Sequence, residues 1–485
     1  MKATSIFGGV QVFNIAISII RSKFIAVLLG PTGMGISGLL TSTTSLISGL
    51  TNFGLGTSAV KNVAASNATG NRTKIAIVVT VLRRWVWITG LFGALVILVL
   101  SPWLSQLTFG NHKYTLAFIW LSVTLLFTQL STGQLVVLQG MRKLQYLAKA
   151  NLAGSVMGLI ITVPLYYWYG VDGIVPAIII TSFTSLTLSW YFARKVKIDA
   201  IKVSPQRTIA EGKSMLFMGF IISLTSLINV GSSYIVRIFI SNLGGIAQVG
   251  LYSAGFSIIF SYVGLIFSAM GTDYYPRLSA VSNNNEQCKK TINQQAEIAL
   301  LLMGPIIMVF LVFIQWVVIL LYSNKFIDIN EMIHWAALGM YFKAVSWSIA
   351  FILLAKGASK LFFWNEMIYS IYSLGLNLLG YRLLGLTGLG LSFMLGYLFY
   401  LTQVFFISKI KYSFAFDSSF IRIFAIQFSL AIVCFIEIKV FARPYSLIIG
   451  VVLILISARL SYLELDKRLG IKAIYANFLE KYIKK

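Results

Sequence analysis

Acidic residues and cysteines are scarce in this chain, and a nucleotide-binding loop is missing from it. Its 485 residues include 14 Asp and Glu against 39 Lys and Arg, and the first acid is Asp172. Cys288 and Cys434 lie far apart and have no His or Cys partner at ligand spacing, so we predict neither a disulfide nor a metal site. No Gly-x-x-x-x-Gly-Lys-Ser/Thr pattern occurs, so we expect no cofactor, and any active transport would draw on a gradient.

The polar surface is also too small for a soluble globule. Hydrophobic residues make up 58% of the chain and charged residues 11%, which is typical of a polytopic membrane protein. A net charge of +25 could suggest nucleic acid as a partner, but the basic residues lie mainly in loops between apolar windows, so we expect none. The first window exceeds a signal-peptide core, contains Arg21 and lacks a small-x-small cleavage site, so we expect it to be retained.

Fourteen apolar windows are long enough to span a membrane as helices. An even number of spans places both termini on one side, and most Lys and Arg of the loops and the tail fall on that side. The positive-inside rule then predicts that both termini are cytoplasmic, and attraction to anionic membrane lipids is secondary. The windows lie at about 5–29, 34–58, 79–104, 115–139, 148–168, 173–193, 214–240, 248–271, 297–322, 332–355, 362–381, 387–408, 419–440 and 444–462.

Six windows, a charged linker and six more windows suggest an internal duplication. A basic residue precedes Leu-Gly by the same interval in the window that begins each half, at Lys23 and at Arg237. A further glycine follows in both halves, Gly35 in the first and Gly250 in the second. The predicted parts are an N-lobe (1–194), a cytoplasmic linker (195–213), a C-lobe (214–410), two further helices (411–462) and a basic cytoplasmic tail (463–485).

The first window carries a polar stripe with a charge in it. Steps of 3, 4 and 3 residues place its members on one helical face, and these are Gln11, Asn14, Ser18 and Arg21. A charge at this depth that faces lipid costs about 3 kcal/mol or more, so we predict that Arg21 faces water, protein or a ligand. The alternative is that its side chain extends to the membrane interface. Lys23 points to another face of the helix, so it is the second candidate, after Arg21, for a charge that faces a ligand.

Other windows contain polar residues at helical spacing, which we predict to line a wet cavity. For the Ser and Thr residues the alternative is that small hydroxyl side chains let helices pack closely. These residues are Thr41, Ser45, Ser48 and Asn52 in window 34–58, Asn229, Ser233 and Arg237 in window 214–240, and Lys343 in window 332–355.

Two acids, Glu366 and Glu437, lie clearly inside apolar windows. Either is a candidate proton site, and the alternatives are a helix-packing hydrogen bond or a carboxylate near the interface. We favour Glu366 for proton coupling.

Several short motifs, in this order along the chain, resemble those of bacterial polysaccharide and O-antigen flippases of the multidrug/oligosaccharidyl-lipid/polysaccharide exporter superfamily. The resemblance covers most of the chain, and the order and positions of the motifs make it specific. The motifs are Leu-Gly-Pro-Thr-Gly-Met-Gly (Leu29 to Gly35), Asn52-Phe-Gly-Leu-Gly with Val60-Lys-Asn-Val-Ala, Leu138-Gln-Gly-Met-Arg142, Glu211-Gly-Lys and Tyr274-Tyr-Pro-Arg-Leu-Ser279.

The resemblance implies an all-α, MATE-like fold: two six-helix bundles that form a V around a central cavity, plus two C-terminal helices. It also implies movement of an undecaprenyl-diphosphate-linked oligosaccharide, an O-antigen or related surface polysaccharide unit, from the cytoplasmic to the outer leaflet. The protein would then be a monomeric transporter and no enzyme, with polysaccharide polymerase and chain-length machinery as partners. Our hypothesis is that Arg21, Arg237, Lys23 and Lys343 hold the diphosphate while the polar stripes bind the sugars.

Two other functions fit a polytopic membrane protein. A drug or organic-cation antiporter on the same fold needs an acidic ion site, and the first five windows contain no acid. A membrane-embedded glycosyltransferase or polymerase usually carries its catalytic residues in a large outer loop, and no loop here is both long and rich in carboxylates.

Overall fold

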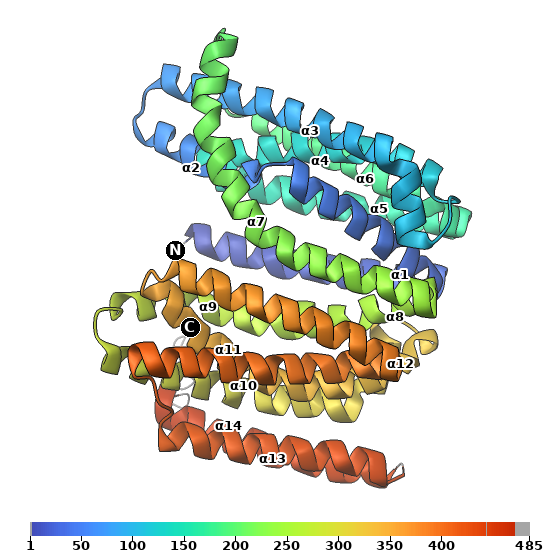
Figure 1. Ribbon diagram of the computed structural model, residues 1–485, viewed down its shortest axis with the longest axis vertical. Coiled ribbons are helices and arrows are strands. Elements are labelled where there is room, and N and C mark those ends of the chain that lie inside the picture. The colour runs from blue at the N-terminus through green and yellow to red at the C-terminus, as the bar shows by residue number, and fades with distance from the viewer. Residues whose placement is uncertain (1, 443, 471–485) are drawn as a thin grey trace, which may run out of the picture. The chain divides into compact units, whose positions relative to one another are not determined.

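The computed structural model describes residues 2–442 and 444–470, and within these ranges it contains helices, turns and loops but no strand (Figure 1). The prediction of an all-α fold is therefore confirmed. The helices are α1 (Lys2–Thr51), α2 (Leu55–Ala68), α3 (Arg72–Phe109), α4 (Thr115–Gly140), α5 (Leu144–Tyr169), η1 (Gly170–Gly173), α6 (Ile174–Arg194), α7 (Pro205–Gly244), α8 (Ile246–Ser257), η2 (Ile258–Val263), α9 (Gly264–Ala280), α10 (Asn285–Leu321), η3 (Asn324–Ile329), α11 (Asn330–Ala355), α12 (Ser359–Tyr412), α13 (Ser418–Val440) and α14 (Tyr445–Leu469).

Across the described residues, nine helical segments are long and apolar enough to cross a membrane. Three of these segments, 13–51, 144–194 and 359–412, each overlap two of the predicted windows, so the nine segments account for twelve windows. The two remaining windows lie in α7 and in α8 to α9. The chain is thus a multi-pass membrane protein, as the sequence predicts.

One predicted boundary is wrong. Window 34–58 runs across the end of α1 at Thr51 and across a turn at Phe53 and Gly54, whose φ angles are 47° and 60°. The left-handed backbone of these two residues interrupts the helix, and α2 begins at Leu55.

A glycine divides α1 where the sequence predicts the boundary between two spans. Gly30 has φ 65° and ψ −167°, a backbone conformation that L side chains rarely adopt, and Pro31 follows it. The result is a kink that separates the segment with Arg21 from the segment that continues to Thr51. Gly385 divides α12 in the same way, with φ 58° and ψ −137°.

The glycines that match between the two halves of the sequence lie against each other in space. A Cβ added to Gly35 would stand 2.0 Å from the carbonyl oxygen of Ile246, and one added to Gly250 would stand 1.9 Å from that of Pro31. No side chain fits at such distances, so α1 and α8 meet backbone to backbone here. Small residues serve this purpose in membrane proteins, where helices gain little from burying apolar side chains.

The described chain divides into two compact units. Of the described residues, the first contains 2–253 and 321–325, and the second contains 254–320, 326–442 and 444–470. Inside the first unit α3 packs along α4, and inside the second α11 packs along α12 (Figure 1). Residues 195–204, between α6 and α7, are not helical. The lobe limits given by the sequence stay a prediction.

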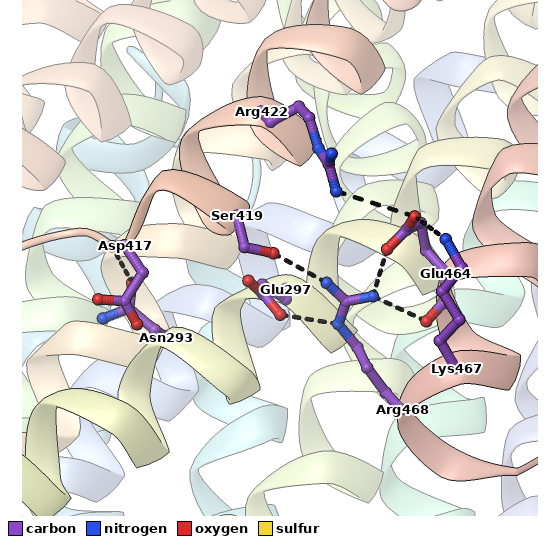
Figure 2. A network of polar contacts seen from close by, with 8 residues as sticks. All are labelled: Asn293, Glu297, Asp417, Ser419, Arg422, Glu464, Lys467 and Arg468. Carbon is purple, nitrogen blue, oxygen red and sulfur yellow. Dashed lines mark hydrogen bonds and ion pairs between the residues drawn. The ribbon is translucent and has the colours of Figure 1, made fainter.

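In the second unit, a network of charged groups joins α14 to α10 and α13 (Figure 2). The Arg468 guanidinium donates from Nε to Glu297 Oε2 at 2.8 Å, from Nη1 to Glu464, and from Nη2 to Ser419 Oγ at 3.0 Å. The Glu297 side chain is 8% exposed and that of Arg468 is 20% exposed. Because Glu297 is buried, its charge depends on this arginine for compensation.

Asn293, one turn before Glu297, fixes the loop that leads into α13 (Figure 2). Its Nδ2 donates to the carbonyl oxygen of Ala415 at 3.1 Å, and its Oδ1 accepts from the backbone N–H of Asp417 at 3.0 Å. Together with the Arg468 network, these bonds attach the two C-terminal helices to α10.

Replacing Arg468 with alanine should destabilise the protein by about 3 kcal/mol, because it leaves Glu297 charged and buried without a partner. Lys467→Ala is the matched control: Lys467 contacts Glu464 at 3.0 Å but is 69% exposed, so its loss should cost less than about 1 kcal/mol. Thermal unfolding of both variants in detergent measures the difference. Equal melting temperatures for the two variants would contradict this account of the network.

Candidate functional site

A polar cavity of about 600 Å³ lies among α1, α4, α5 and α6 of the first unit, and we call it the Arg21 cavity. Half of its described lining residues are Ser or Thr, and none is acidic. The lining residues are Asn14 and Arg21 from α1; Thr128, Ser131, Thr132 and Leu135 from α4; Ala150, Asn151, Gly154, Ser155 and Gly158 from α5; and Ile178, Thr181, Ser182, Ser185 and Ser189 from α6.

Arg21 and Asn14 reach this cavity from one face of α1, because seven residues correspond to about two helical turns. Arg21 Nε and Asn14 Oδ1 are both buried and have no hydrogen-bond partner among the described residues. The buried hydroxyl of Tyr166 lies near the guanidinium of Arg21. Within the part of the chain that the structure describes, Arg21 forms no ion pair. The cavity therefore holds a positive charge that no carboxylate neutralises.

Several hydroxyl groups around the cavity donate their protons to carbonyl oxygens of their own helix. Thr132 donates to the Thr128 carbonyl at 2.9 Å, Thr181 to Ala177 at 2.7 Å, and Ser189 to Leu186 at 2.9 Å. A hydroxyl that donates in this way still has oxygen lone pairs for an incoming donor. The lining thus offers acceptors for the hydroxyl groups of a ligand, and Arg21 offers donors for an anion.

Two members of the predicted stripe line the cavity together, and Ser18 does not. Asn14 and Arg21 line the cavity, whereas Ser18 is exposed and Lys23 is not among the lining residues. The side chain of Gln11 lies outside the described residues. Sequence reasoning missed the hydroxyl groups of α4, α5 and α6. Their signal was Ser and Thr at steps of three and four residues in 128–132 and 181–189.

Arg237, in α7, lies outside the Arg21 cavity. Its Nη1 donates to the hydroxyl and the carbonyl of Ser233, and its Cζ lies 5.7 Å from the ring centre of Tyr252. Its Nε is buried without a hydrogen-bond partner in the described chain. Asn229, two turns earlier in α7, is exposed. The structure does not place Arg21 and Arg237 in one cavity, so their joint action stays a hypothesis.

The polar residues of the second α1 segment are spread over several environments. Thr41 and Ser45 are exposed, and Ser48 is half-buried. Asn52 Oδ1 accepts from the backbone N–H of Gly54 at 2.8 Å, so this side chain stabilises the turn between α1 and α2. None of the four lines the Arg21 cavity.

A buried hydroxyl chain that the sequence analysis missed connects α1, α3 and α7. Thr43 lies 3.3 Å from Thr108, and Thr108 lies 2.7 Å from the hydroxyl of Tyr234. Such pairs hold membrane helices together.

Lys343 and Glu366 share a second cavity, of about 250 Å³, in the second unit, which we call the Lys343 cavity. Lys343 Nζ lies 4.4 Å from the ring centre of Phe260 and 5.3 Å from that of Tyr397, and the rings of Phe267 and Phe393 are within 6 Å. Aromatic faces attract an ammonium group by about 0.5 to 2 kcal/mol each. Among the described residues, Lys343 and Glu366 form no ion pair with each other.

Neutral groups hold the Glu366 carboxylate. The Tyr400 hydroxyl and Asn365 Nδ2 both donate to Glu366 Oε1, the latter at 3.3 Å. Gln403 Nε2 in turn donates to Asn365 Oδ1 at 2.8 Å. Because Glu366 precedes the Gly385 kink and Tyr400 follows it, these bonds join the two segments of α12.

Comparison with known proteins agrees with this architecture. Residues 24–331 match a family described as polysaccharide biosynthesis protein. A putative O-antigen transporter of Shigella flexneri is 23% identical over 346 residues, which cover 70% of this chain and 80% of that protein.

Two solved structures have the same fold. The lipid II flippase MurJ in an inward closed conformation aligns with a TM-score of 0.73 at 13% identity, over 95% of this chain and 99% of that one. An inward-facing multidrug resistance transporter of the MATE family aligns with a TM-score of 0.68 at 16% identity, over 83% of this chain and 94% of that one. At these identities the likeness establishes the fold alone, and it confirms the predicted MATE-like fold.

The family match covers more than half of the chain and agrees with the resemblance noted from the sequence motifs. The chain belongs to the polysaccharide biosynthesis protein family.

Proposed function

We propose that this protein is a flippase that moves an undecaprenyl-diphosphate-linked oligosaccharide from the cytoplasmic to the outer leaflet of the bacterial inner membrane. The observation that carries the proposal is the Arg21 cavity, where a guanidinium without a carboxylate partner stands among hydroxyl and amide groups. The family match and the relative described as a putative O-antigen transporter support the same class of cargo.

The chemistry of the cavity suits both parts of such a head group. A diphosphate is expensive to bring into hydrocarbon, and a guanidinium, which stays protonated, binds phosphate oxygens with two parallel hydrogen bonds. Sugar hydroxyls are donors, and the Ser and Thr oxygens of α4 and α6 are available acceptors. A volume of about 600 Å³ lies within the range of small-molecule sites and suits a few sugar units. The polyprenyl tail would stay in the lipid.

Transport in this proposal is alternating access, and no covalent bond forms or breaks. Arg237, Lys23 and Lys343 are proposed as further positive charges along the path, and each lies outside the Arg21 cavity. Glu366 is proposed as the proton-coupling group, and both termini are proposed to be cytoplasmic. A monomer that cooperates with a polysaccharide polymerase and chain-length machinery fits this role.

A cation antiporter on the same fold is the main alternative. It would need a carboxylate to hold its cationic cargo in the first unit, whereas the described lining of the Arg21 cavity carries a cation. A glycosyltransferase or polymerase would need catalytic acids or bases beside the sugars, and none of the described lining residues is acidic.

Arg21→Ala should reduce flipping of a labelled lipid-linked oligosaccharide about tenfold or more, because hydrogen bonds to a charged group contribute about 1.5 to 3 kcal/mol. The assay uses proteoliposomes and counts the substrate that reaches the opposite leaflet. Arg21→Lys should retain part of the activity, since it keeps the charge but not the paired donors.

Ser18→Ala is the matched control for the Arg21 variants, because Ser18 lies on the same helix but does not line the cavity. Both alanine variants should insert and unfold like the unmodified protein. Normal flipping by a correctly inserted Arg21→Ala protein would refute the role of Arg21.

Glu366→Gln should abolish the response of flipping to an imposed pH gradient, because a glutamine amide does not take up or release a proton as a carboxylate does. The glutamine oxygen still accepts the Tyr400 hydrogen bond, so the fold should be retained. Flipping in proteoliposomes with and without the gradient measures the effect, and Tyr400→Phe controls for loss of the hydrogen bond. An unchanged gradient response in the glutamine variant would rule out Glu366 as the coupling group.

A further inference from the structure

A third cavity, of about 930 Å³, lies in the first unit where α3 meets residues 198–209, and we call it the Arg83 cavity. It contains none of the residues assigned to transport above. Arg83 and Arg84 line it together with Trp87, Ile88 and Ile209. The cavity lies near the start of the apolar window that begins at residue 79, so it lies close to one surface of the membrane.

Arg84 and Trp85 build the wall of this cavity by holding the linker on α3. Arg84 Nη1 donates to the Val203 carbonyl oxygen and to Thr208 Oγ1, both at 2.7 Å. Trp85 Nε1 donates to the Thr208 carbonyl oxygen at 3.2 Å. The start of α7 and the residues before it are therefore fixed against α3.

Arg83 is the arginine of the cavity that does not hold the linker, so its guanidinium can bind a ligand. It is exposed and has no hydrogen-bond or ion-pair partner in the described part of the chain. Asp199 also lines the cavity, and among the described residues it forms no ion pair with either arginine. Residues 194–213 contain six Lys and Arg and two acids, so the surroundings are also positive.

Apolar side chains continue from the cavity along α3. Trp87 and Ile88 are each 51% exposed, and Ile209 is 61% exposed. Leu91 and Leu95 follow at one-turn steps on α3 and are also exposed. A cation at the membrane surface thus stands next to an apolar face that extends toward the membrane interior.

We propose that the Arg83 cavity binds an anionic phospholipid of the bilayer, with Arg83 on the headgroup phosphate and the acyl chains along Trp87, Ile88 and Leu91. The arginine supplies charge-assisted hydrogen bonds to phosphate, and the apolar face matches hydrocarbon chains. A free phosphate ion would use only the first of these two features. The proposal does not depend on the identity of the transported glycan.

Native mass spectrometry of the full-length protein in detergent tests this site. The protein is titrated with phosphatidylglycerol or with phosphatidylcholine that has the same acyl chains. We expect preferential retention of phosphatidylglycerol, and Arg83→Gln should weaken its binding about fivefold, since one basic residue near an anionic headgroup contributes about 1 kcal/mol. Arg72→Gln is the matched control, because Arg72 is an exposed arginine of the same helix that does not line the cavity.

Three further measurements keep the proposal falsifiable. Trp87→Ala should weaken phosphatidylglycerol binding while the arginine is intact, and inorganic phosphate should not compete. Equal binding of phosphatidylglycerol to the Arg83→Gln and Arg72→Gln proteins would overturn the proposal, as would equal retention of the two lipids. Displacement of phosphatidylglycerol by an equal concentration of undecaprenyl phosphate would also overturn it, because the site would then belong to the cargo lipid.

Discussion

The guanidinium of Arg21, inside a membrane helix, is the constraint around which the first unit is arranged. Arg21 cannot face hydrocarbon without a cost of about 3 kcal/mol or more, so this face of α1 is turned toward α4, α5 and α6. These helices supply hydroxyl and amide groups where a carboxylate would have neutralised the arginine permanently. Neutral acceptors leave the charge without a carboxylate partner, which is what the proposed role of Arg21 in holding an anion requires.

The close contacts between helices depend on glycine and on short polar side chains. Gly35 and Gly250 bring the backbones of α1 and α8 together, and the hydroxyl chain from Thr43 through Thr108 to Tyr234 crosses three helices. In lipid, apolar side chains gain little by leaving their surroundings, so packing and hydrogen bonds carry most of the association. Gly35 and Gly250, which the sequence analysis matched between the two halves, supply the small residues on both sides of one such contact.

Apolar length and helical spacing predicted much of the fold and part of the site. A run of about twenty apolar residues has to form a helix in lipid, which is why almost every window lies on a helix. Asn14 and Arg21 could be placed together because both lie on one helix. The hydroxyl groups of α4, α5 and α6 could not be assigned to the cavity from the sequence. Ser and Thr also occur at contacts between helices, and only tertiary packing decides which of them line a cavity. Asn52 was predicted to line a cavity, and it stabilises a turn because a local backbone N–H lies within its reach.

The Arg21 cavity and the Lys343 cavity differ in a way that suits different tasks. The Arg21 cavity has a guanidinium and a lining of neutral acceptors, which suits an anionic ligand with hydroxyl groups. The Lys343 cavity contains an ammonium group among aromatic rings and a carboxylate whose described hydrogen bonds come from neutral donors. Because no cation pairs with Glu366 in the described chain, gain or loss of its proton changes the charge of that cavity by one unit. The two proposed roles, cargo binding by Arg21 and proton exchange by Glu366, would together meet the needs of a gradient-coupled transporter of anions.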